Sequence, residues 1–214
     1  MISTSLSPIS FKGVIILKKY KLVVAIEGID GAGKTTLVNA LKNEFDNDIC
    51  IYSRTKKGKI AKSLLNHFPL NRSHILQIPF YHALSIINFL KREQQKSASI
   101  LLMDRCFLSN ICYYYPVAMN NRLFYFLAML FEVKVLPKII FIIDEEAEIA
   151  QKRDKMEKSL EWLKHTRLNY LKAKNAKSLR KYDITVIPNT LSIEKKLRII
   201  KQKISEGMRK NDIR

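Results

Sequence analysis

The sequence has few cysteines, and their spacing argues against two classes of protein. The 214 residues include three cysteines, Cys50, Cys106 and Cys112. An odd number without a Cys-x-x-Cys pair argues against a disulfide-stapled scaffold and against a structural zinc site. We therefore predict a reduced, cytoplasmic protein.

Long apolar runs are also missing, although apolar residues are plentiful. No run reaches the roughly 20 residues of a membrane-spanning helix, so we expect no membrane partner. A hydrophobic fraction of 47% argues against a disordered chain and is enough for a packed core. We predict one domain over residues 21–207, preceded by a flexible extension over 1–20 and followed by a basic tail over 208–214.

Acidic residues are scarce beside basic ones. Lys and Arg number 38 and Asp and Glu 19, which gives a formal net charge of +19. Such a charge favours anionic partners, namely nucleic acid, phosphorylated small molecules or an acidic membrane. No basic cluster has the interleaved aromatic residues that stack on bases, so nucleic acid is the weaker interpretation. A phosphate-handling enzyme would account for part of the charge, and a merely basic surface is the alternative.

Apolar runs typical of strands alternate with segments typical of helices. The predicted strands are 22–26, 49–52, 100–103, 138–143 and 184–187. Apolar residues at helical spacing predict helices over 35–45, 60–65, 75–90, 123–131, 147–174 with a break near Asp154, and 193–204. Continuous apolar strands alternating with helices are typical of a parallel sheet covered on both faces. We predict an α/β three-layer sandwich around a five-stranded parallel sheet.

A glycine-rich motif follows the first predicted strand. Residues 28–35 read Gly-Ile-Asp-Gly-Ala-Gly-Lys-Thr and fit the GxxxxGK[ST] pattern at every required position. Glycines let backbone N–H groups approach phosphate oxygens, and the helix that follows directs its positive end at the same anion. The motif predicts a nucleoside-triphosphate site on a P-loop NTPase fold. The expected ATP-binding residues are Gly28, Ile29, Asp30, Gly31, Ala32, Gly33, Lys34, Thr35 and Thr36.

Acidic residues lie beside this motif and at the end of another strand. Glu27 ends the first strand, and we weigh a catalytic role equally against a structural hydrogen bond to a neighbouring loop. Asp30 would repel a triphosphate, so it needs a partner such as a hydroxyl, a water or an arginine. Asp104 ends the third strand, where it can hold Mg²⁺ through water, and Arg105 can clamp a phosphate. A surface ion pair is the alternative for these two.

Four segments, in order, resemble the thymidylate kinase family. Residues 22–36 (LVVAIEGIDGAGKTT) look like its opening, and residues 137–153 (PKIIFIIDEEAEIAQKR) resemble the strand and helix that lead into its lid. Arg54 and Gly58 fall where the family has an arginine and a glycine. The family's DRxxxSxxxY segment is similar to Asp104, Arg105, Ser109 and Tyr113. The resemblance implies a nucleoside monophosphate kinase that uses ATP, with dTMP as the favoured acceptor in dTTP biosynthesis.

The resemblance also implies a role for each matching position. Lys34 handles ATP, Thr35 and Asp104 serve the Mg²⁺ cofactor, and Asp30 approaches the 3′-hydroxyl of the acceptor. Phe80 would stack on the acceptor base, with plain core packing as its alternative. The expected acceptor-binding residues are Asp30, Arg54, Phe80, Arg105, Ser109 and Tyr113.

A further catalytic cation is expected from the lid. Family members take an arginine from the P-loop or from the lid, and here the loop position is Ala32. The short lid near 151–160 must then supply it. We predict Arg153, with Lys152 and Lys155 in reserve and a solvated helix face as the alternative. The catalytic set is thus Lys34, Asp104, Arg105 and Arg153. A homodimer through 123–131 would also fit the family, with plain core packing as the alternative for that segment.

Two other functions stay open. In a deoxynucleoside kinase of related fold, Glu27 would act as base on a 5′-hydroxyl and Arg105 would steady it. A basic P-loop ATPase that binds nucleic acid is favoured by the net charge but opposed by the lack of a recognition motif.

Overall fold

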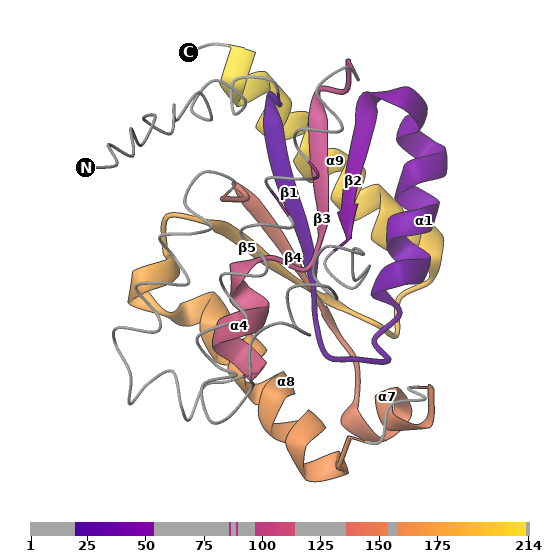
Figure 1. The fold of residues 1–214 in the computed structure, drawn as a ribbon, viewed down its shortest axis with the longest axis vertical. Coiled ribbons are helices and arrows are strands. Elements are labelled where there is room, and N and C mark those ends of the chain that lie inside the picture. The colour runs from indigo at the N-terminus through magenta and orange to yellow at the C-terminus, as the bar shows by residue number, and fades with distance from the viewer. Residues whose placement is uncertain are drawn as a thin grey trace, which may run out of the picture.

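The computed structural model describes residues 20–53, 86, 89, 97–113, 136–153 and 158–212. Five parallel strands form one sheet in the order β2-β3-β1-β4-β5 (Figure 1). Their bounds are β1 Leu22–Glu27, β2 Ile49–Ser53, β3 Ile100–Asp104, β4 Ile139–Asp144 and β5 Asp183–Pro188. The prediction of an α/β fold with a five-stranded parallel sheet is confirmed.

Helices cover both faces of the sheet. Helices α1 (Lys34–Phe45) and α9 (Ile193–Asp212) pack together on one face, and α4 (Phe107–Tyr113) packs against α8 (Leu160–Asn175) on the other (Figure 1). Helix α7 (Ala147–Arg153) follows β4 and contacts α8. Two short 3₁₀ turns, η3 (Asp46–Asp48) and η6 (Lys177–Leu179), lead into β2 and toward β5. Strand β3 is buried throughout, because a central parallel strand has no face left for water.

The predicted strand bounds agree with the structure to within one residue, and the helices differ more. The predicted break near Asp154 is confirmed, because α7 ends at Arg153 and α8 begins at Leu160. Ser159 caps α8 by accepting a hydrogen bond from the Trp162 backbone N–H at 3.2 Å. Helix α4 was not predicted, since a seven-residue helix that is buried on most sides shows no amphipathic period.

The last helix is longer than predicted. Helix α9 continues past Ile204 to Asp212, so residues 208–212, expected as a tail, are helical. The extension packs on the sheet, because Gly207 lies against Ile139 and Leu22 and Met208 packs on the core. Of the predicted helix 75–90 the structure describes Ile86 and Phe89, both helical. The segments 1–19, 60–65 and 123–131 lie outside the described residues. None of the described helices is long and apolar enough to span a membrane.

The strand order brings two polar segments together. Strand β1 lies between β3 and β4, and Ile26 of β1 is paired with Asp104 of β3. The glycine-rich loop that follows β1 therefore lies beside the Asp104–Arg105 segment that follows β3. In open parallel sheets, ligands bind in the crevice outside these carboxyl ends of the strands.

Gly31 allows the glycine-rich loop to lie directly against α7. A Cβ on Gly31 would meet the Ala150 carbonyl oxygen at 2.1 Å, and its φ of +80° is itself unfavourable for other residues. Gly33 has nearly the same φ, +79°, but a Cβ there would have its nearest neighbour, Asn189 Nδ2, at 4.0 Å. Gly31 is therefore required both by its left-handed backbone and by the close approach of α7. Gly33 is required by its left-handed backbone alone.

We expect Gly31→Ala to destabilise the protein by about 2 kcal/mol or more, since strain and a backbone clash add. Gly33→Ala is the matched control, with an expected loss of about 1 kcal/mol from backbone strain alone. Urea unfolding without nucleotide measures both. Equal losses in the two variants would mean that the approach of α7 is not what requires Gly31.

Candidate active site

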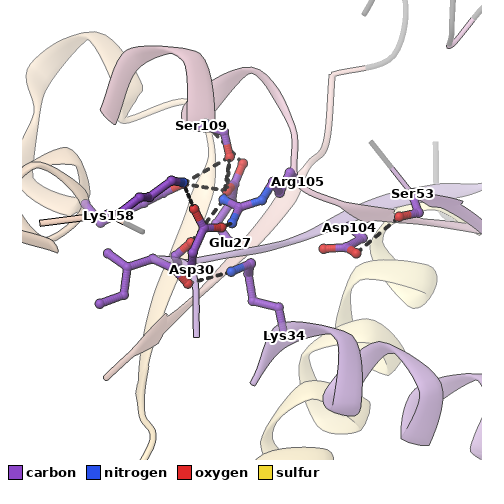
Figure 2. Close-up of polar contacts among 11 residues, drawn as sticks. Glu27, Asp30, Lys34, Ser53, Asp104, Arg105, Ser109 and Lys158 are labelled. Carbon is purple, nitrogen blue, oxygen red and sulfur yellow. Dashed lines mark hydrogen bonds and ion pairs between the residues drawn. The ribbon is translucent and has the colours of Figure 1, made fainter. Parts of the chain in front are cut away.

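Lys34 begins α1 directly after the glycine-rich loop. Its ammonium donates to the Ile29 carbonyl oxygen at 2.6 Å, across the loop (Figure 2). Burial, together with repulsion from Arg105, lowers the pKa of Lys34 to about 7. Thr35 and Thr36 follow it at the exposed start of the helix. The first turn of α1 carries a positive partial charge, and the buried Lys34 ammonium adds a full charge at the same place, directly after the loop.

Glu27 is completely buried, and groups of the protein itself satisfy the hydrogen-bonding capacity of its carboxylate. One carboxylate oxygen accepts from the backbone N–H groups of Cys106 at 2.7 Å and Ser109 at 3.2 Å. The other accepts from the Ser109 hydroxyl at 2.7 Å and the Tyr170 hydroxyl at 2.9 Å. Such a carboxylate has neither solvent access nor a free lone-pair direction toward a ligand. The structure supports the structural alternative for Glu27 rather than the role of a general base.

Arg105 joins the loop after β1 to α4. Its guanidinium donates to the Gly28 carbonyl oxygen at 3.1 Å and to Ser109 Oγ at 3.3 Å, and it forms an ion pair with Asp30. Figure 2 shows it between the Glu27–Ser109 group and Asp30. Its φ of +73° is rare for a residue with a side chain, and its guanidinium stacks 5.0 Å from the centre of the Tyr113 ring. The buried arginine thus holds the acid of the P-loop in place.

Asp30 carries a second cation, Lys158, which precedes α8 (Figure 2). Although burial alone would raise the pKa of Asp30, the charges of Arg105 and Lys158 hold it below its usual value. The Lys158 ammonium also lies 5.0 Å from the Tyr113 ring centre and 4.4 Å from that of Trp162. Sequence reasoning missed Lys158, because nothing in the sequence distinguishes it from the nearby cations at 152, 153 and 155.

Arg153 lies elsewhere in the site. It ends α7 and forms an ion pair with Glu145 at 2.5 Å, which also accepts from the Asn189 amide at 2.5 Å. The Lys196 ammonium bonds to the Asn189 carbonyl oxygen at 3.0 Å. Arg153 is therefore held near the end of β4 and the loop after β5, whereas Lys158 is the lid-side cation that contacts Asp30. That Arg153 is catalytic stays a prediction.

Arg167 fixes the lid-proximal part of α8 to the end of β4. Its guanidinium binds both carboxylate oxygens of Asp144, at 2.6 and 3.1 Å, and also reaches Glu146. A two-point arginine–carboxylate contact sets orientation as well as distance. Sequence reasoning did not single out Arg167. The run of three acids at 144–146, which calls for a cationic partner, was the available signal.

The remaining predicted residues divide into described and undescribed ones. Asp104 is buried at the end of β3 and accepts from Ser53 Oγ at 3.3 Å. Ser109 is predicted to line an acceptor pocket, and its hydroxyl is hydrogen-bonded to Glu27 and Tyr170. Tyr113 packs edge-on against Trp162, with ring centres 4.9 Å apart. Arg54, Gly58, Phe80 and Lys155 lie outside the described residues.

Comparison with known proteins identifies the family of the chain. The family model described as thymidylate kinase matches residues 26–204. The chain belongs to the thymidylate kinase family. A probable thymidylate kinase from Methanosphaera stadtmanae is 30% identical over 84% of this chain and 98% of its own length. Probable thymidylate kinase 1 from Saccharolobus solfataricus is 28% identical over 70% of this chain and 82% of its own length.

A solved structure is similar to this thymidylate kinase family member in fold. It is a deoxyadenosine kinase from M. mycoides with the products dCMP and a flexible dCDP bound. It is 16% identical and has a TM-score of 0.59, over 86% of this chain and all of that one. The family and the fold together make this protein an ATP-dependent phosphotransferase, a nucleoside monophosphate kinase. The P-loop prediction from residues 28–35 agrees with that activity.

We expect Glu27→Gln to lower the free energy of unfolding by about 3 kcal/mol, because an amide NH₂ would face buried hydrogen-bond donors. Tyr170→Phe removes one of those donors and should cost about 1 kcal/mol. Urea unfolding measures both. An unchanged unfolding midpoint with lost turnover in Glu27→Gln would instead assign the carboxylate to the reaction.

ATP binding should take up a proton at about pH 8, where ATP itself is fully ionised. Lys34, with its pKa lowered to about 7, is then mostly neutral, and a triphosphate beside it restores the charged form. Calorimetry in two buffers of different ionisation enthalpy should give about one proton per ATP, and affinity should rise as the pH falls toward 7. Zero uptake would show that Lys34 is already charged.

Proposed function

We propose that the protein transfers the γ-phosphoryl group of ATP to dTMP, giving ADP and dTDP. The observation that carries the proposal is that the Lys34 ammonium and the Asp30–Arg105 ion pair lie near enough to interact electrostatically, at the adjacent ends of β1 and β3. Relatives that match along most of the chain are named thymidylate kinases. A P-loop that faces a second, separately charged site fits a two-substrate reaction rather than hydrolysis.

ATP would lie along residues 28–36. The backbone N–H groups at the start of α1 and the Lys34 ammonium would meet its β- and γ-phosphates, displacing Lys34 from the Ile29 carbonyl. Asn189, whose amide nitrogen lies 4.0 Å from the position that a Cβ on Gly33 would take, borders the loop from the β5 side. Arg153, held by Glu145 in the same region, would face the triphosphate from α7.

The residues present fit a Mg²⁺ ion with few protein ligands. Mg²⁺ keeps several waters, takes oxygen ligands and binds phosphates together with one or two protein oxygens. The Thr35 hydroxyl and the buried Asp104 carboxylate, whose one described hydrogen bond is that from Ser53, are donors of this kind. When bound, the ion would neutralise charge on the β- and γ-phosphate oxygens.

The acceptor would bind on the other side of Lys34. Asp30 would take the sugar 3′-hydroxyl, and Arg105 would turn part of its guanidinium to the acceptor phosphate, with Arg54 as its predicted partner. Tyr113, Ser109 and the predicted stacking residue Phe80 complete this side. An oxygen of the acceptor phosphate then attacks the γ-phosphorus, the bond to the β-phosphate oxygen breaks, and the fixed cations stabilise the charge of the transition state.

The deoxynucleoside kinase alternative needs Glu27 as a base. Because Glu27 is fully buried and bonded to Cys106, Ser109 and Tyr170, that role has no support in the geometry.

The experiment is ADP release from Mg-ATP with a panel of acceptors: dTMP, dUMP, UMP, CMP, AMP, GMP and thymidine. We expect the highest kcat/KM with dTMP. Turnover with thymidine but not dTMP would move the protein to the nucleoside kinases. The absence of acceptor-dependent ADP release would overturn the proposal.

Lys158→Met should lower kcat with dTMP about 10- to 100-fold, because it removes a cation that contacts Asp30 at the acceptor side. Lys164→Met is the matched control, since Lys164 pairs with exposed Glu148 outside the site and should leave kcat unchanged. Arg153→Ala should lower kcat more than ATP affinity. Steady-state kinetics with each substrate varied distinguishes these outcomes, and a normal kcat in Lys158→Met would leave Arg153 as the lid cation.

A further inference from the structure

Much of the positive charge lies away from the catalytic site. The catalytic residues follow the carboxyl ends of β1 and β3, but a run of cations directly precedes β5, at the amino end of that strand. The strands of this sheet are five or six residues long, or about 20 Å at about 3.3 Å per residue. A bound nucleotide at the P-loop therefore does not account for this charge.

Hydrogen bonds place several cation-bearing segments side by side at this edge. The Asp183 N–H donates to the Lys138 carbonyl oxygen at 3.0 Å, so the end of 177–182 lies beside the start of β4. The Asn211 amide donates to the Lys21 carbonyl oxygen at 2.8 Å, and the Lys138 ammonium bonds to Asn211. The end of α9 thus lies beside the starts of β1 and β4 (Figure 1).

We call this edge the basic rim. Its cations come from the end of α8, the segment after it, the starts of β1 and β4, and the last part of α9. They are Lys172, Lys174, Lys177, Arg180, Lys181, Lys21, Lys138, Lys203, Arg209 and Lys210.

Acidic residues do not balance the rim. Residues 172–182 contain no acid, and the next one, Asp183, is paired with Lys203 at 2.9 Å. Among the described residues, no carboxylate lies in ion-pair distance of Lys174, Lys177 or Arg180. Nearby acids are Glu206 and Asp212 of α9 and Asp48. Asp48 accepts from the Ser99 N–H, and the Ser99 carbonyl oxygen accepts from the Lys21 N–H. Ten cations against these three acids and Asp183 leave the rim with a clear excess of positive charge.

The fold does not require this concentration of charge. Cations in the last turn of α8, namely Lys172 and Lys174, are stabilised by the helix dipole. That reason does not extend to Lys177, Arg180 and Lys181, which lie beyond the helix and repel one another. The Lys181 ammonium lies 5.1 Å from the centre of the Tyr182 ring, but the described residues offer Lys177 and Arg180 no ion-pair partner. A partner of opposite charge would stabilise these two.

We propose that the basic rim binds the phosphate backbone of double-stranded nucleic acid. The cations follow the line of strand starts from β5 through β4 to β1, which suits a linear array of phosphates. The rim's aromatic residue Tyr182 is buried, so binding would use phosphates rather than base stacking and would not prefer single strands. The exposed large apolar side chains of the described residues, Ile149 and Leu168, lie outside the rim, which leaves a membrane without an anchor there.

The test is the affinity of the full chain for a random 30-base-pair DNA duplex, measured by fluorescence anisotropy at several salt concentrations. The rim variant carries Lys174→Gln, Lys177→Gln and Arg180→Gln. The control carries Lys42→Gln, Lys195→Gln and Arg198→Gln, which are exposed cations of α1 and of the first half of α9. Each variant loses three charges, so both have a formal charge of 19 − 3 = +16.

We expect the rim variant to bind at least about tenfold more weakly at about 0.1 M salt. Its slope of log K against log salt should be shallower by about 3, or about one per lost phosphate contact. The control should lose much less, and phosphoryl transfer to dTMP should be unchanged in the rim variant, since the rim lies at the opposite edge from the P-loop.

Three results would overturn the proposal. The first is no duplex binding by the wild-type chain at about 0.1 M salt. The second is an equal loss in both variants, which would reduce the effect to net charge. The third is tighter binding to vesicles containing anionic lipid than to the duplex. Because kinase turnover is measured separately, failure here is distinct from failure of the proposed function.

Discussion

The buried carboxylate of Glu27 is the interaction on which the arrangement of the site depends. It ends the central strand β1 and is hydrogen-bonded by the start of α4, through Cys106 and Ser109, and by α8, through Tyr170. A charge placed out of water is stable only when its lone pairs are satisfied. Three segments distant in sequence are therefore held at one point, and the P-loop that leaves this point starts from a fixed position.

From this anchor the charges alternate outward toward solvent. Arg105 lies next to Ser109, Asp30 next to Arg105, and Lys158 next to Asp30 (Figure 2). Burial would raise the pKa of Asp30, but the charges of Arg105 and Lys158 on either side hold it below its usual value. Lys34 is separate from this series and donates to a backbone carbonyl. The site therefore holds Asp30, Arg105 and Lys158 in mutual pairs and leaves Lys34 on a neutral backbone carbonyl, which is easily exchanged for another acceptor.

The two edges of the sheet have different electrostatic characters. At the carboxyl edge, acids and bases are interleaved and several are buried, as the Asp30 and Arg167 ion pairs show. At the amino edge most of the cations are exposed, and they outnumber the acids near them. Parallel strands separate these edges because every strand starts at one and ends at the other. A net charge summed over the chain cannot distinguish the two, although they suit different partners.

Local patterns in the sequence determined the strands, the P-loop and the family, because apolar runs and glycine spacing act over a few residues. Only the tertiary structure decided the role of Glu27, since its partners lie 79, 82 and 143 residues away. It likewise placed Arg153 on Glu145 and Lys158 on Asp30, a choice among neighbouring cations that depends on where α7 ends and α8 begins. Contacts of this kind form between elements brought together by sheet order and helix packing, and no local spacing encodes them.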